Sequence, residues 1–159
     1  MILDNLTDLE QAVKPKRTIF QTIAMIIEIV LGVFLGIGVL FKLQSFPYAS
    51  EFLILSMTSL AGLYMAIPIP LFRSSKIWEH ILAYISGFAL AIALIGALFK
   101  IESWPYASEM LIVALFTLVP LLIGLALLIV VNFNDTEKRA FYLRIGLRCL
   151  ILFLVFNYR

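Results

Sequence analysis

Five charged residues stand inside or at the ends of long apolar runs, where a charge needs a partner. Glu28 lies within the first run, and two lysine–glutamate sets follow it, Lys42 with Glu51 and Lys100 with Glu109. A carboxylate deep in a membrane segment is costly and indicates a functional site by default, such as a proton or ion pathway. A lysine and a glutamate at the two ends of a short turn can instead pair with each other, or each can extend to the lipid headgroups.

The composition of the chain indicates an integral membrane protein. Of its 159 residues, 63% are hydrophobic and 14% are charged, and the mean hydropathy is +1.06. Soluble domains are about half apolar and about a quarter charged. The net charge of +2 is too small to indicate a nucleic-acid partner. The single cysteine, Cys149, cannot form an intramolecular disulfide.

Four apolar stretches reach the length of about 20 residues that a membrane-spanning helix needs. They cover approximately residues 19–41, 51–72, 77–99 and 108–131. Backbone groups in lipid must bond within their own segment, so we expect helices here rather than loops. The predicted fold is an all-α membrane protein with four transmembrane helices. These form two hairpin repeats, residues 19–72 and 77–131, that run parallel to each other.

The two ends of the chain have patterns of their own. Residues 1–18 are mostly polar and contain a capping box, which predicts a short amphipathic arm on the cytoplasmic surface. Residues 132–159 begin with a polar linker and continue into an apolar helix over residues 140–156. Arg144 and Arg148 lie inside that helix and weigh against crossing. It is therefore predicted either as a fifth transmembrane helix with snorkelling arginines or as a helix in the membrane interface.

One motif occurs twice and marks the tip of each hairpin. Residues 40–54 and 98–112 are identical at eleven of fifteen positions, which indicates a tandem duplication. Proline suits the first position of the following helix, and aromatic side chains suit the membrane interface. We therefore expect two matching turns, built from Phe46, Pro47 and Tyr48 and from Trp104, Pro105 and Tyr106.

Small residues four positions apart predict where helices approach each other closely. Gly32 and Gly36 form one such stripe, and Ala89, Ala93 and Ala97 form another. In lipid, where helices have no hydrophobic drive to associate, such stripes allow tight van der Waals contact. We expect both stripes to pack inside the protein.

The distribution of lysine and arginine predicts the orientation of the chain. The residues before the first span and the loop between the second and third spans are richer in these residues than the two tips. By the positive-inside rule, the N-terminus is then cytoplasmic and the tips at Lys42 and Lys100 face outward.

The stretch from Gly96 to Val113, "GALFKIESWPYASEMLIV", resembles the GldL-type membrane hairpin. This is the N-terminal region of subunit L of the gliding-motility and type IX secretion motor, a pattern common in inner-membrane proteins of Bacteroidetes. The resemblance implies a helical hairpin in the bacterial inner membrane, and only Lys42 and Lys100 match its functional motif. Where the family's motor members carry an ion-coupling glutamate in the second helix, this chain has Leu60 and Leu118.

The function predicted from these observations is that of a non-enzymatic scaffold or accessory subunit of a membrane complex. The expected partners are the lipid bilayer and other membrane subunits or further copies of the chain, with no cofactor or metal. Motifs of metalloproteases and serine hydrolases are absent from the sequence. The alternative is a proton or ion conduit that uses Glu28 with Lys42 and Lys100. A purely structural Glu28 is expected to be protonated or bonded to neighbours such as Tyr84 or Ser86.

Overall fold

The computed structural model describes residues 19–72, 77–132 and 135–157, and this part of the chain is helical between short turns. The helices are α2 (Ile19–Leu43), α3 (Ala49–Ala66), α4 (Pro68–Phe72), α5 (Ile77–Ile101), α6 (Ala107–Val131) and α7 (Thr136–Asn157). Four of them, α2, α3, α5 and α6, are long and apolar enough to cross a membrane. The predicted membrane fold of four spans and a further C-terminal helix is confirmed. The predicted arm at residues 1–18 lies outside the described residues.

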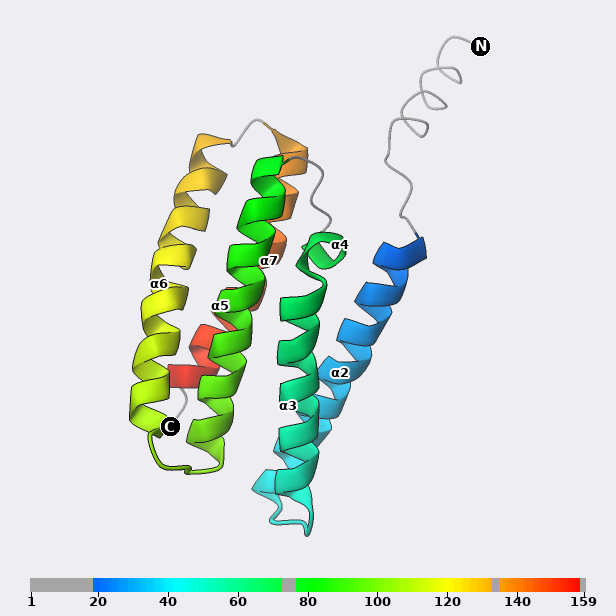
Figure 1. Cartoon of the computed structure of the whole chain (residues 1–159), viewed down its shortest axis with the longest axis vertical. Helices are drawn as coiled ribbons and strands as arrows, with labels where there is room; N and C mark the ends of the chain where they lie inside the picture. The colour runs from blue at the N-terminus through cyan, green and yellow to red at the C-terminus, as the bar shows by residue number, and fades with distance from the viewer. Residues whose placement is uncertain (1–18, 73–76, 133–134, 158–159) are drawn as a thin grey trace.

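Helix α5 is the centre of the bundle and packs against α3, α4, α6 and α7 (Figure 1). Helix α2 lies at one edge, where it contacts α3 and α4. Burial follows from these positions, because the most apolar stretch of α5 is 61% buried and that of α2 is only 11% buried. The core is therefore built mainly from α5, and the outward faces of the bundle are apolar, as lipid-facing helices require.

The alanine stripe of α5 lies inside the bundle, as the sequence predicts. Ala89, Ala93 and Ala97 are 4%, 0% and 1% exposed. Nearby, a Cβ atom built on Gly87 would overlap the backbone carbonyl oxygen of Tyr64 in α3. Small residues on α5 thus let its neighbours come close enough for backbone contact.

The glycine pair of α2 does not pack inside the protein, so that prediction is wrong. A Cβ atom built on Gly32 or Gly36 would have nothing within 4 Å, and both residues are exposed. The reason is the edge position of α2, which turns this face away from α3. A different glycine of α2, Gly38, makes the helix contact, with Leu53 atoms 3.2 Å from its built Cβ.

The two hairpin tips share one backbone geometry. Ser45 and Tyr48 have φ angles of 55° and 65°, and the equivalent Ser103 and Tyr106 have 53° and 66°. The backbone hydrogen bonds match as well. They run from Ser45 N to Lys42 O (3.1 Å) and Ser103 N to Lys100 O (3.2 Å), and from Phe46 N to Phe41 O and Trp104 N to Phe99 O (both 3.0 Å). The repeated sequence therefore encodes a repeated turn.

The prolines of the tips do not open the following helices, in contrast to the prediction. Helices α3 and α6 begin at Ala49 and Ala107, two residues after Pro47 and Pro105. Tyr48 and Tyr106 stand between proline and helix in the left-handed conformation, which cannot continue a right-handed helix. Each proline is thus part of the turn.

Glycine at a strained tip position is expected to stabilise the protein. A non-glycine residue in the left-handed region costs about 1–2 kcal/mol, and glycine adopts it freely. Glycine also raises the conformational entropy of the unfolded chain, which offsets part of this gain. We therefore expect Ser103→Gly to raise the free energy of unfolding by about 1 kcal/mol. The matched control is Ser59→Gly inside α3, which should lower it by roughly 0.5–1 kcal/mol. Thermal unfolding in detergent compares the two, and a destabilised Ser103→Gly protein would contradict the expectation.

Helix α7 runs along the bundle, antiparallel to α6 and next to α5 (Figure 1). Asp135 begins it by accepting a hydrogen bond from the backbone amide of Lys138 at 3.2 Å. Its buried stripe repeats at helical spacing and consists of Phe141, Tyr142, Ile145, Cys149 and Leu152. Of the two placements left open by the sequence, the packed one is therefore favoured.

Candidate functional site

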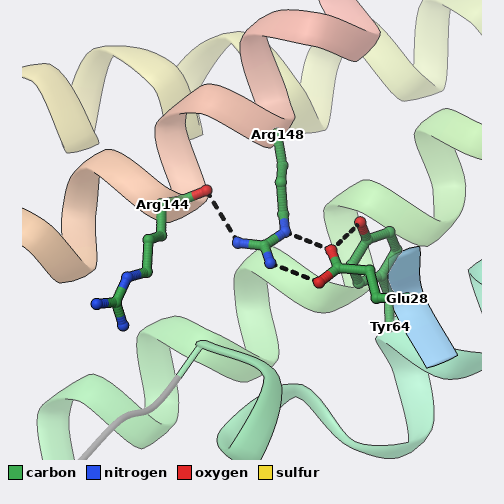
Figure 2. A network of polar contacts seen from close by, with 4 residues as sticks. All are labelled: Glu28, Tyr64, Arg144 and Arg148. Carbon is green, nitrogen blue, oxygen red and sulfur yellow. Dashed lines mark hydrogen bonds and ion pairs between the residues drawn. The ribbon is translucent and has the colours of Figure 1, made fainter. Parts of the chain in front are cut away.

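Three helices meet at a charged cluster inside the bundle, formed by Glu28 of α2, Tyr64 of α3 and Arg148 of α7. Figure 2 shows the Arg148 guanidinium and the Glu28 carboxylate facing each other, with the Tyr64 hydroxyl beside them. Arg148 donates from Nε to Glu28 Oε1 and from Nη2 to Glu28 Oε2, the second bond being 2.6 Å long. Tyr64 donates from its hydroxyl to Glu28 Oε1 at 2.7 Å. The carboxylate thus receives three hydrogen bonds.

The surroundings of the cluster fix the guanidinium on its other sides. Its Cζ atom lies 5.2 Å from the centre of the Phe72 ring, a cation–π distance. The Phe72 ring stacks on that of Tyr64 with a centroid distance of 6.3 Å. Arg148 also donates from Nη1 to the carbonyl oxygen of Arg144 at 3.1 Å. A planar guanidinium can donate to a carboxylate and a carbonyl oxygen while it lies over an aromatic ring, whereas the ammonium group of a lysine does not provide this planar set of donors.

A break between two helices places Phe72 in this cluster. Helix α3 ends at Ala66, and Pro68 begins the short helix α4 in a new direction. The five residues of α4 then bring Leu71 and Phe72 into the core, at 5% and 0% exposure. Without the break, the chain would continue past the end of the bundle, and the arginine would lose its aromatic neighbour.

The geometry gives the cluster a structural role. The side chains of Arg148 and Glu28 are 22% and 12% exposed, so the pair is largely removed from solvent. A buried carboxylate is retained when it is paired and its remaining lone pairs are bonded, as they are here. The cluster ties together the edge helix α2 and the C-terminal helix α7, which have no other substantial contact among the described helix pairs.

The partners of Glu28 differ from those expected. The sequence suggested Tyr84 or Ser86, but Tyr84 is 52% exposed on the outer face of α5. Ser86 is buried, and its hydroxyl has no hydrogen-bond partner among the described residues. The actual partner, Arg148, is 120 positions away in the chain. The signal available in the sequence was two arginines inside one apolar helix and one glutamate inside another.

A second charged contact joins the two hairpin tips. Lys42 Nζ lies 2.9 Å from Glu102 Oε2 and donates to Ser50 Oγ at 2.7 Å. Glu102 is largely buried, with 7% of its side chain exposed. The predicted pairing of Lys42 with Glu51 is therefore wrong, because the lysine turns toward the other hairpin. Glu102 replaces Gln44 of the first tip, and this difference between the copies was the available signal.

The remaining predicted residues lie at the tips without forming a common site. Glu51 is exposed, and Glu109 accepts a hydrogen bond from the Ser108 hydroxyl at 2.8 Å. Lys100 is half-buried at the end of α5. The tip aromatic residues are exposed, at 52% for Phe46 and 37% for Trp104. No cluster of histidine, cysteine or carboxylate residues among the described positions is suited to a metal ion.

Comparison with known families bears on the second hairpin. Residues 85–127, from the middle of α5 to near the end of α6, match the family model of the GldL N-terminal domain. This segment is similar to a GldL-type membrane hairpin. The resemblance inferred from the repeated motif is thereby confirmed for the second copy, while the tandem duplication stays a prediction. No match was found among curated proteins or among solved structures.

The hairpin that resembles the GldL N-terminal domain contains most of α5, the central helix of the bundle. Its tip carries Glu102, which pairs with the first hairpin, and its helix α5 carries the buried alanine stripe. The Glu28 cluster lies outside the matched segment, on α2, α3 and α7. The ion pair that joins α2 to α7 is therefore a feature of the chain beyond the matched hairpin.

Proposed function

We propose that this protein is a non-enzymatic scaffold or accessory subunit of an inner-membrane complex related to gliding or secretion. The observation that carries the proposal is the GldL-type hairpin at residues 85–127, built into a bundle of apolar helices. The buried ion pair supports it, because Glu28 is engaged in holding three helices together. The N-terminus is cytoplasmic and the two tips face outward in this proposal, following the positive-inside rule.

The tips are the proposed contact surface for another subunit. Tyr48 and Tyr106 are 79% and 73% exposed at equivalent positions of the two turns. Aromatic residues are enriched in protein interfaces and supply large contact areas at low entropic cost. The Lys42–Glu102 pair sets the spacing between the tips, so both tyrosines are presented together. A partner that engages both would bind more tightly than one that engages a single tip.

The test is isolation of the protein from its native membrane in mild detergent, followed by identification of co-purifying subunits and measurement of the complex mass. We expect a stoichiometric membrane-protein partner. Its recovery should fall when Tyr48→Ser and Tyr106→Ser are combined. The control is Trp78→Ser, which removes an aromatic residue that is 81% exposed at the opposite end of the bundle. A homogeneous monomer with no partner would contradict the proposal.

The alternative of a proton or ion conduit through Glu28 has less support. Its carboxylate is bonded to an arginine and a tyrosine, and Lys42 is occupied with Glu102 and Ser50 at the tip. A relay would need further titratable groups in line with Glu28. Proton flux into vesicles that contain the purified protein, abolished by Glu28→Gln, would favour the conduit over the scaffold.

A further inference from the structure

We propose that α7 is a fifth membrane-spanning helix whose insertion depends on the Glu28–Arg148 ion pair. Its C-terminal end then lies on the same side of the membrane as the two tips. This inference concerns the topology of the chain and does not rest on the proposed function.

The length and both faces of α7 fit a helix that crosses the membrane within a bundle. Its first four residues, Thr136 to Arg139, are polar, and its apolar part, residues 140–156, has about 17 residues, which is the lower limit of length for a membrane span. One face is buried against α5 and α6. The outward face is apolar too, with Leu143, Leu147, Leu150 and Ile151 at 50%, 60%, 45% and 54% exposure. An interfacial helix would instead present one polar face to water.

The direction of α7 follows from its neighbours. It begins just after α6 ends at Val131, and it runs back along α5 and α6 toward the tips (Figure 1). Its first residues therefore lie at the end of the bundle opposite the tips. A helix packed lengthwise against two spans lies within the same layer that they cross.

The charges of Arg144 and Arg148 weigh against insertion of α7, and the structure accommodates each charge in a different way. Arg148 is neutralised by the carboxylate of Glu28 and lies over the Phe72 ring. Arg144 is one turn closer to the start of α7, and its side chain points away from the cluster in Figure 2. A long arginine side chain at that depth can snorkel toward the nearer interface. Arg148 is thus the arginine of α7 whose charge is neutralised by a carboxylate inside the bundle.

The topology is tested with single cysteines in the full chain, after the native cysteine is removed by Cys149→Ser. Ser103→Cys reports the tip side, Thr136→Cys reports the opposite side, and Asn157→Cys reports the end of α7. Each is treated with a membrane-impermeant maleimide on right-side-out and on inverted membranes. We expect position 157 to label from the same side as position 103. Labelling from the same side as position 136 would overturn the proposal.

The dependence on the ion pair is tested by adding Glu28→Gln to the same proteins. We expect tip-side labelling at position 157 to fall by about tenfold or more, because an unpaired arginine opposes insertion strongly. Adding Arg148→Met as well should restore it. Glu109→Gln, which removes an exposed tip carboxylate, is the matched control and should change nothing. Unchanged labelling with Glu28→Gln would overturn the dependence.

The single variant Arg148→Met distinguishes the loss of charge neutralisation from a general folding defect. Arg148→Met alone removes the charge from α7 and leaves the carboxylate of Glu28 on α2, so no charge on α7 at this position opposes its insertion and position 157 should still label from the tip side. If it moved to the opposite side, the placement of α7 would rest on the arginine itself, and the proposed role of neutralisation would be wrong.

Discussion

Replacement of Glu28 by alanine is expected to lower the free energy of unfolding by about 3–5 kcal/mol, the range seen when one partner of a buried ion pair is removed. The physical reason is the arginine that stays behind. Arg148 would keep its carbonyl and aromatic neighbours but lose its only described anionic partner. Tyr64 would lose the acceptor of its hydroxyl as well. Titration with a denaturing detergent, followed by circular dichroism, measures the loss.

The matched controls separate the stranded charge from the simple removal of a side chain. Glu109→Ala removes a glutamate that is exposed at a tip, and it should change stability by about 0.5 kcal/mol or less. The double variant Glu28→Gln with Arg148→Met replaces the ion pair by groups of similar length without a charge. It should recover most of the loss, because uncharged replacements of a buried pair are often close to neutral. A double variant as unstable as Glu28→Ala would contradict this account.

The sequence predicted those features of the fold that depend on local pattern. The number of spans follows from apolar length, and the matching tips follow from a motif that recurs with eleven identical residues. The buried stripe of Ala89, Ala93 and Ala97 follows from spacing on one helix. Each of these properties is decided within about 20 neighbouring residues, so a window along the chain contains the necessary information.

The pairing of charges could not be predicted in this way, because it depends on which helices are neighbours. One hypothesis from the sequence pairs Lys42 with Glu51 across its own turn, but the packing of the two hairpins brings Glu102 to Lys42 instead. For a structural Glu28, the sequence suggests protonation or bonds to neighbours such as Tyr84 or Ser86 of α5, whereas α7 returns along the bundle and supplies Arg148. The same limit explains Gly32 and Gly36, since a stripe of small residues does not reveal which helix lies at the edge.

Introduction of a methyl group at Gly87 is expected to be the most damaging single change among the glycines. The Cβ atom of Gly87→Ala would overlap the backbone oxygen of Tyr64 and lie 3.0 Å from Cβ of Pro68. Backbone cannot rotate away as a side chain can, so α3 and α5 must separate. Overpacking of this kind costs about 1–3 kcal/mol, which outweighs the roughly 1 kcal/mol that alanine gains over glycine in a helix. Because Tyr64 also bonds Glu28, the shift should weaken the charged cluster too.

Two other glycines provide a graded comparison with the same substitution. At Gly96, a Cβ atom would lie 3.2 Å from Ala114 Cβ and from the Met110 carbonyl oxygen, so a small adjustment suffices. At Gly32 nothing lies within 4 Å, and alanine there should stabilise the protein by up to about 1 kcal/mol through helix propensity. The expected order of stability is therefore Gly32→Ala, then Gly96→Ala, then Gly87→Ala, as measured by unfolding in detergent. Equal effects at positions 87 and 32 would mean that α3 and α5 do not approach as closely as the structure has them.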